Sequence, residues 1–203
     1  GWLSEDSPDD ADRLARASTF ISDPIAGTRS FIEGAGAWAH SLAVARHGKV
    51  TAAVVYLPAK DRLYAARAGG GATLGTRPIA CTRQATSAQA HVLAAAPALD
   101  PRHWRAGRVP ALVRHHRPSL AYRLALVAEG RFDAMLTLRD SWEWDIAAGA
   151  LILAEAGATV SDRAGAPLRF NNPWPKLRGV LAGHAPLHAD LLSRLAPPDE
   201  PGP

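Results

Sequence analysis

Cysteine is almost absent from this sequence, because Cys81 is the only one among 203 residues. A disulfide framework needs cysteine pairs and a cysteine-rich zinc site needs several thiolates, so both classes are excluded within one chain. No apolar run approaches the roughly 18 residues of a membrane-spanning helix. The first residues carry neither the basic stretch nor the apolar stretch of a signal peptide. We therefore expect a soluble, cytoplasmic protein without a membrane partner.

Lysine is also scarce, since only three of the 23 basic Lys and Arg residues are lysines, and the net charge is only +4. Arginine suits planar, bidentate recognition of phosphate. The basic residues are scattered and form no aromatic-basic module, so a nucleic-acid polymer is not the expected partner. Hydrophobic residues at 47% and charged residues at 21% indicate an ordinary globular chain, and they exclude disorder, collagen and coiled coils.

The first part of the chain predicts an antiparallel meander. The apolar run at residues 19–22 predicts a buried strand that Pro24 stops. Residues 28–33 predict a short helix that ends at Gly34. Alternating side chains and turn residues predict three more strands, of which the first two form a hairpin. These strands are expected at residues 38–46, 50–57 and 62–68.

The second part predicts an α/β lobe with a mixed sheet, because strands and helices alternate there. Strands are expected at residues 91–96, 132–138, 158–161 and 179–182, and helices at residues 119–129, 145–156 and 186–195. We accordingly divide the chain into an antiparallel-sheet lobe at residues 1–85 and an α/β lobe at residues 86–196. The proline-rich residues 197–203 predict a disordered tail.

Three acidic residues stand in settings that favour a metal site. Asp23 ends an apolar strand, where α/β proteins place ligands, Asp145 begins a predicted helix, and Glu5 lies in the segment Leu-Ser-Glu-Asp. Hard cations such as Mg²⁺ prefer carboxylate oxygens from separate elements. Each residue also has a structural alternative, since Asp145 suits a helix N-cap, Asp23 a turn and Glu5 an ordinary surface position.

Gly27 and Thr28 add a candidate phosphate site at a strand-to-helix turn. A glycine lets the backbone approach a ligand closely, and the free N–H groups of a helix start favour phosphate. The alternative is a plain turn. The pair His115-His116, flanked by Arg114 and Arg117, either meets a phosphate or forms a solvated basic loop, and the loop is the favoured interpretation.

These segments together resemble the signature motifs of the inositol monophosphatase superfamily, whose members are Mg²⁺-dependent, lithium-sensitive phosphatases. The resemblance lies in residues 3–6 (Leu-Ser-Glu-Asp), 23–28 (Asp-Pro-Ile-Ala-Gly-Thr), 144–149 (Trp-Asp-Ile-Ala-Ala-Gly) and 155–157 (Glu-Ala-Gly), in family order. Residues 2–5, 28–31, 126–130 and 143–145 most resemble the bacterial CysQ-type 3′(2′),5′-bisphosphate nucleotidases. The implied fold is α+β, a layered α-β-α-β-α sandwich of the sugar-phosphatase type that lacks its N-terminal helices.

The resemblance also implies a role for each motif residue. Two or three Mg²⁺ ions would be held by Glu5, Asp23, the Ile25 carbonyl and Asp145, and Glu5 would help to hold the attacking water. The substrate phosphate would contact residues 26–28, which are Ala26, Gly27 and Thr28. The Thr28 hydroxyl would help to orient the water, which makes Glu5 and Thr28 the expected catalytic residues.

The sequence departs from the family pattern in two ways. Position 26 is Ala, where the family has an aspartate that binds metal, so we expect weakened catalysis. The N-terminal helices of the family are missing before the Leu-Ser-Glu motif, and exposed apolar surface then favours a homo-oligomer.

The expected function is Mg²⁺-dependent hydrolysis of a small phosphorylated metabolite. Adenosine 3′,5′-bisphosphate, converted to AMP, is the favoured substrate. One alternative is an inositol or other sugar-phosphate monophosphatase. The other is a catalytically inactive homologue that binds phosphate or acts as an assembly subunit, which Ala26 supports.

Overall fold

A seven-stranded sheet forms one side of the molecule. The computed structural model describes residues 1–197. The strands lie in chain order, and neighbours are antiparallel except for the parallel pair β1–β2. Their bounds are β1 Trp2–Ser4, β2 Thr19–Ala26, β3 Ala39–Arg46, β4 Lys49–Leu57, β5 Arg62–Arg67, β6 Ala72–Leu74 and β7 Arg77–Pro78. The predicted meander is confirmed from β2 to β5, and β1, β6 and β7 extend the sheet beyond the predicted strands.

A five-stranded mixed sheet forms the second layer of strands, in the order β12-β14-β10-β8-β9. Its bounds are β8 His91–Ala94, β9 Val113–His115, β10 Ala134–Thr137, β12 Thr159–Ser161 and β14 Val180–Gly183. Strands β8, β9 and β10 run parallel, and β14 is antiparallel to both β10 and β12. A small separate ladder joins β11 (Ser141–Trp142) to β13 (Lys176–Leu177). The predicted mixed sheet is confirmed.

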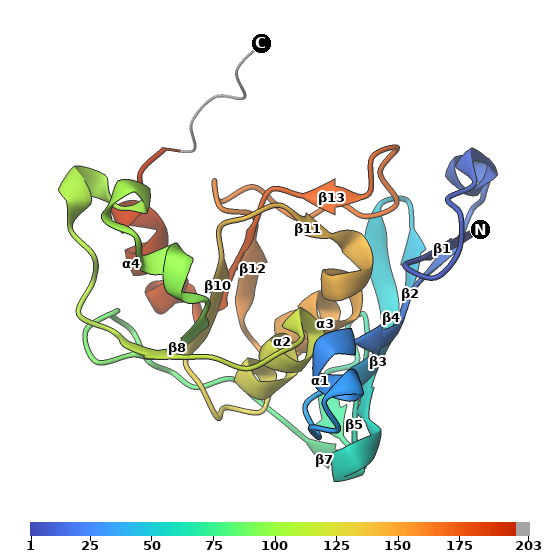
Figure 1. The fold of residues 1–203 in the computed structure, drawn as a ribbon, viewed down its shortest axis with the longest axis horizontal. Coiled ribbons are helices and arrows are strands. Elements are labelled where there is room, and N and C mark those ends of the chain that lie inside the picture. The colour runs from blue at the N-terminus through green and yellow to red at the C-terminus, as the bar shows by residue number, and fades with distance from the viewer. Residues whose placement is uncertain (198–203) are drawn as a thin grey trace.

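Helices α2 (Leu120–Ala128) and α3 (Glu143–Glu155) lie between the two sheets, as Figure 1 shows. They share one apolar core with both sheets. Helix α4 (Ala185–Arg194) covers the far face of the second sheet, where a second core forms. Helix α1 (Thr28–Ile32) follows β2, and the short 3-10 helices are η1 Ala11–Ala15, η2 Pro58–Lys60, η3 Ala96–Leu99, η4 Pro101–His103 and η5 Arg105–Gly107. The predicted layered α+β sandwich is confirmed.

Small side chains bring α3 close to the first sheet. On β3, the inward-facing residues Ala39, Ser41, Ala43 and Ala45 are all buried, and α3 contacts both β3 and β4. On the neighbouring helix pair, a Cβ at Gly149 of α3 would lie only 2.6 Å from the Leu124 Cβ of α2. The absence of side-chain bulk at these positions therefore sets the layer spacing.

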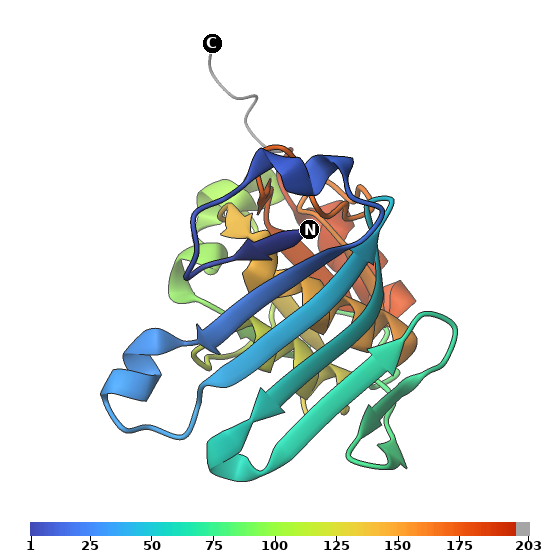
Figure 2. The same cartoon turned by 90° about the vertical axis from the view of Figure 1, so that its right-hand side faces the viewer.

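The outer face of the first sheet is not covered by any helix in residues 1–197 (Figure 2). Four large apolar side chains on this side are exposed, namely Trp2 at 49%, Phe20 at 44%, Leu42 at 38% and Leu63 at 42%. Trp2 and Phe20 stand opposite each other in the β1–β2 register, as Leu63 stands opposite Tyr56. The expected exposed apolar surface is present.

Two sequence predictions at strand and helix ends are wrong. Strand β2 does not stop at Pro24 but continues to Ala26, because a register irregularity between Asp23 and Ala26 accommodates a residue without an N–H group. Helix α3 begins at Glu143 with Trp142 as its N-cap, so Asp145 lies inside the first turn and is not the cap.

A buried polar pair ties α4 to β12 on the far side of the molecule. Ser161 Oγ lies 2.7 Å from His188 Nε2, and burial lowers the pKa of His188.

In residues 1–197, no helix has the length and apolar character needed to cross a membrane. The division near residue 85 stays a prediction, and the predicted tail beyond Pro197 lies outside the described residues.

Candidate metal and phosphate site

Strand pairing places Glu5 beside Asp23. Ser4 of β1 is in register with Ser22 of β2, so the residues that follow them along these parallel strands are neighbours. The Glu5 backbone N–H donates to the Ser22 carbonyl at 3.4 Å, which continues the pairing by one residue. Glu5 is exposed, whereas Asp23 is buried at 1% exposure.

Asp145, in the first turn of α3, lies in the same region because α3 is hydrogen-bonded to β3 next to Asp23. Ser41 of β3 stands opposite Asp23 in the sheet register, and the Ser41 hydroxyl donates to the Trp144 carbonyl at 3.2 Å. This bond holds the first turn of α3 over the sheet at the position of Asp23. Half-buried Asp145 therefore comes near the other two carboxylates from a third element.

The three carboxyl groups act on one another electrostatically. Burial, the charges of Glu5 and Asp145, and a hydrogen bond with Glu5 raise the pKa of Asp23 to about 8. Burial and the charge of Glu5 raise the pKa of Asp145 to about 6, although Arg139 and Arg123 oppose the shift. Mutual repulsion of this kind is relieved by a cation, because an opposite charge favours the ionised carboxylates.

The donors fit Mg²⁺ by type, because carboxylate oxygens are the ligands that hard cations prefer. Their arrangement is not a closed shell, since no three His, Cys, Asp or Glu side chains in residues 1–197 surround a common point as a ready-made metal site. Ala26, the last residue of β2 and the residue before Gly27, is buried at 1% exposure. Its methyl group supplies no donor.

The segment after Asp23 is held by its own hydrogen bonds. The Ile25 N–H donates to Asp23 Oδ1 at 3.1 Å, and the Thr28 hydroxyl donates to the Ile25 carbonyl, also at 3.1 Å. Gly27 adopts the left-handed conformation with φ 95°, and a Cβ there would lie 3.3 Å from both the Ala37 carbonyl oxygen and the Ser119 Cβ. The position therefore requires glycine for both conformation and space.

Two arginines near Asp145 were not found by the sequence analysis. Arg123 of α2 is 8% exposed, and burial together with the charge of Arg139 lowers its pKa to about 10. It makes no salt bridge within residues 1–197; its guanidinium donates to the Arg117 carbonyl and lies 2.9 Å from His116 Nε2. The available signal in the sequence was a single charged residue, Arg123, in a helix otherwise made of Leu, Ala, Val and Tyr.

The basic loop before α2 has separate parts. His116 contacts Arg123, whereas the His115 ring lies beside His91, with 2.9 Å between the facing ring nitrogens, and the Arg117 guanidinium lies over the Phe132 ring. His116 through its ring and Arg117 through its carbonyl are therefore linked to Arg123, whereas the His115 ring is not.

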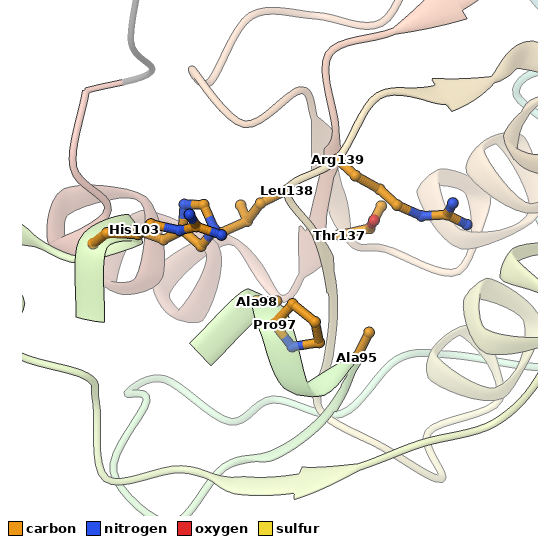
Figure 3. Close-up of a pocket in the computed structure, with 8 residues that line it drawn as sticks. Ala95, Pro97, Ala98, His103, Thr137, Leu138 and Arg139 are labelled. Carbon is orange, nitrogen blue, oxygen red and sulfur yellow. The ribbon is translucent and has the colours of Figure 1, made fainter. Parts of the chain in front are cut away.

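A cavity of about 300 Å³ opens at the carboxyl ends of the parallel strands β8 and β10. It is lined by Ala95, Pro97, Ala98, Arg102, His103, Thr137, Leu138 and Arg139. Figure 3 shows His103 at one end and the Arg139 guanidinium directed away from it at the other. Arg139 thus lines this cavity and also acts on Asp145 electrostatically.

The sequence profile of the inositol monophosphatase family matches residues 1–197. The chain therefore belongs to the inositol monophosphatase family. The fold agrees, because the crystal structure of inositol monophosphate-bound SaIMPase-II superposes with a TM-score of 0.83 at 24% identity, over 95% of this chain and 74% of that one.

Two relatives carry different activities in their names. An inositol-1-monophosphatase of Rhizobium meliloti is 35% identical over 73% of this chain, and this chain spans only 58% of its length. A 3′-phosphoadenosine 5′-phosphate phosphatase of Mycobacterium tuberculosis is 32% identical over 96% of this chain and 72% of its own length. The names of these relatives therefore do not select one substrate.

Proposed function

We propose that this chain is a Mg²⁺-dependent phosphomonoesterase that favours a 3′-phosphorylated adenosine nucleotide and converts adenosine 3′,5′-bisphosphate to AMP. Two or three bound Mg²⁺ ions would supply the Lewis acidity that activates water and stabilises the leaving oxygen. Glu5, Asp23, the Ile25 carbonyl and Asp145 are the proposed ligands. The mutual repulsion of the three carboxylates supports this assignment.

The roles at the phosphate follow from the same segment. Glu5 and the Thr28 hydroxyl would hold the attacking water. The backbone at Ala26, Gly27 and Thr28 would contact the phosphate group that the water attacks. The bond from Thr28 to the Ile25 carbonyl supports this role, because it places the hydroxyl beside a proposed metal ligand.

The observation that favours a nucleotide with two phosphates is the buried Arg123. No carboxylate in residues 1–197 forms a salt bridge with this guanidinium, and burying an unpaired charge is costly. Arg139 adds a like charge beside Arg123, which the charge of Asp145 opposes. A second substrate phosphate would compensate both charges. Uncharged inositol hydroxyls would not, so inositol phosphates are the second candidate, which several relatives named inositol monophosphatase favour.

Ala26 supports a third candidate, an inactive homologue that binds phosphate or acts as an assembly subunit. The missing carboxylate leaves the metals with less negative charge, so we propose impaired turnover within an intact binding site. Lithium sensitivity and a cytoplasmic location also stay proposals. The uncovered outer sheet face supports a homo-oligomer.

Ligand binding tests the substrate proposal without depending on turnover. Calorimetry with Mg²⁺ present compares adenosine 3′,5′-bisphosphate with 3′-AMP, in the unmodified chain and in Arg123→Met, with Arg46→Met as an exposed control. A charge-assisted hydrogen bond contributes about 1.5–3 kcal/mol, so Arg123→Met should weaken the bisphosphate about 10- to 100-fold and 3′-AMP much less. Equal binding of both nucleotides by all three chains, or tighter binding of inositol 1-phosphate, would contradict the proposal.

A further inference from the structure

Arg13 is a buried cation that the proposed chemistry does not use. It lies in η1 at 2% exposure, and each of the three guanidinium nitrogens donates at least one hydrogen bond. Its Nε donates to Asp9 Oδ1 at 2.6 Å and its Nη2 to Asp9 Oδ2 at 2.9 Å. Burying a guanidinium is unfavourable unless the charge is paired and the donors are satisfied. Its surroundings are therefore built for this side chain.

The other side of the guanidinium binds a segment 158 residues further along the chain. Nη1 donates to Asn171 Oδ1 at 2.7 Å, and Nη2 donates to the Asn172 carbonyl at 2.9 Å. Asn171 also returns a side-chain bond to the Arg13 carbonyl at 3.4 Å. With φ 62°, Asn171 adopts the left-handed conformation that asparagine tolerates.

The same two asparagines bind a buried carboxylate from the opposite side. Glu143 is 0% exposed and accepts the backbone N–H groups of Asn171 and Asn172, the second at 2.9 Å. It also accepts the Asn172 side-chain amide at 2.7 Å. Residues 171 and 172 are thus held between Arg13 and Glu143, and both of these side chains are hydrogen-bonded to both asparagines.

Both ends of this network adjoin a proposed metal ligand. Asp9 follows Glu5 by four residues, and Glu143 precedes Asp145 by two residues in the first turn of α3. We propose that Arg13 is a positioning residue of the metal site. Through Asn171, Asn172 and Glu143, it holds residues 5–9, the Glu5 loop, against the first turn of α3. This inference rests on the proposed function, because it treats Glu5 and Asp145 as metal ligands.

The hydrogen-bond network would hold the Glu5 loop where the pairing of β1 with β2 does not. The Glu5 loop leaves the sheet after the three residues of β1, so backbone pairing alone holds it weakly. Outer-shell hydrogen bonds orient metal ligands, and their loss costs about 10- to 100-fold in metal affinity. The lowered pKa of Asp9, caused first by its bond to Arg13, agrees with a tightly held pair.

Arg13→Met removes the donors while keeping an unbranched apolar stem. We expect Mg²⁺ affinity, measured by calorimetry, to fall about 10- to 100-fold. Asn171→Gly is the milder variant, because glycine keeps the left-handed backbone and loses only the side-chain bonds. It should lower Mg²⁺ affinity less and in the same direction. The matched control is Arg194→Met, which removes the exposed i,i+4 pair with Asp190 and should leave Mg²⁺ affinity unchanged.

Hydrogen exchange without metal supplies the second readout. Arg13→Met and Asn171→Gly should speed exchange at residues 5–9 and at residues 143–145 together, and Arg194→Met at neither. Unchanged Mg²⁺ affinity in folded Arg13→Met and Asn171→Gly, or faster exchange at residues 5–9 alone, would overturn the inference. If the unmodified chain binds no Mg²⁺, the proposed function fails, and the exchange comparison alone decides whether Arg13 couples the two segments.

Discussion

Replacing Ala26 by aspartate tests whether this site lacks one carboxylate. Ala26 is the last residue of β2, 1% exposed and paired with Ala39. A carboxylate there would join Glu5, Asp23 and Asp145, which already repel one another. Without metal, Ala26→Asp should therefore destabilise the fold, because a buried charge near like charges is unfavourable. Mg²⁺ should restore that stability, because a ligand that binds the folded state stabilises it.

The same change should raise turnover. One electrostatic contact to the transition state contributes about 3–4 kcal/mol, which corresponds to roughly a 10²- to 10³-fold change in rate. We therefore expect Ala26→Asp to increase Mg²⁺-dependent, lithium-inhibited release of phosphate from adenosine 3′,5′-bisphosphate by that factor. Phosphate binding should change little, because it relies on the backbone at Gly27 and Thr28.

The assay is phosphate release against Mg²⁺ concentration, together with thermal unfolding with and without Mg²⁺. Ala26→Asn is the matched control, since it has nearly the same shape as Ala26→Asp and no charge. The reasoning is refuted if alanine, asparagine and aspartate at this position turn over equally, or if Mg²⁺ raises the unfolding temperature of all three by the same amount.

Three further predictions concern the rest of the fold. The uncovered sheet face should drive self-association, since apolar burial contributes about 25 cal/mol per Å²; sedimentation at micromolar concentration should show dimers or larger species that Phe20→Lys with Leu42→Lys disrupts, and a clean monomer would contradict this. The lowered pKa of His188 means that the folded state favours the neutral ring, so the stability it contributes is lost as pH falls through about 6.5; urea unfolding at pH 5.5 and 7.5 should show a smaller pH effect in His188→Gln, and equal effects would count against it. Gly149→Ala should cost about 1–3 kcal/mol, because the new methyl group collides with Leu124; an unchanged urea midpoint would show that the helices separate freely.

The periodic parts of the chain were predictable because burial imposes a simple period. The alternation at residues 38–46 identified β3, and the apolar spacing at residues 119–129 identified α2. Pro24 was misjudged because a register irregularity, which is a property of the strand pair, absorbs the missing donor. The start of α3 was misjudged because Trp142 caps the helix through its backbone alone.

The candidate site was predictable only as a set of motifs. Glu5, Asp23 and Asp145 were selected from their segments, and the structure brings them into electrostatic contact. Arg123 was missed because its significance lies in its burial and in the like charge of Arg139, and Arg13 because it binds Asn171, which is distant in sequence. Such contacts follow from packing of layers and leave no periodic signal in a single sequence.

A calorimetric titration with Mg²⁺ tests the metal assignment most directly. Asp145→Asn removes the charge of a proposed ligand and keeps its shape, and Asp61→Asn makes the same change in the β4–β5 turn, where the left-handed backbone suits asparagine. The unmodified chain and Asp61→Asn should bind Mg²⁺ equally, and Asp145→Asn should bind at least about tenfold more weakly, a difference of about 1.4 kcal/mol. Equal Mg²⁺ affinity in all three chains, or no Mg²⁺ binding by the unmodified chain, would contradict a metal site built on Glu5, Asp23 and Asp145.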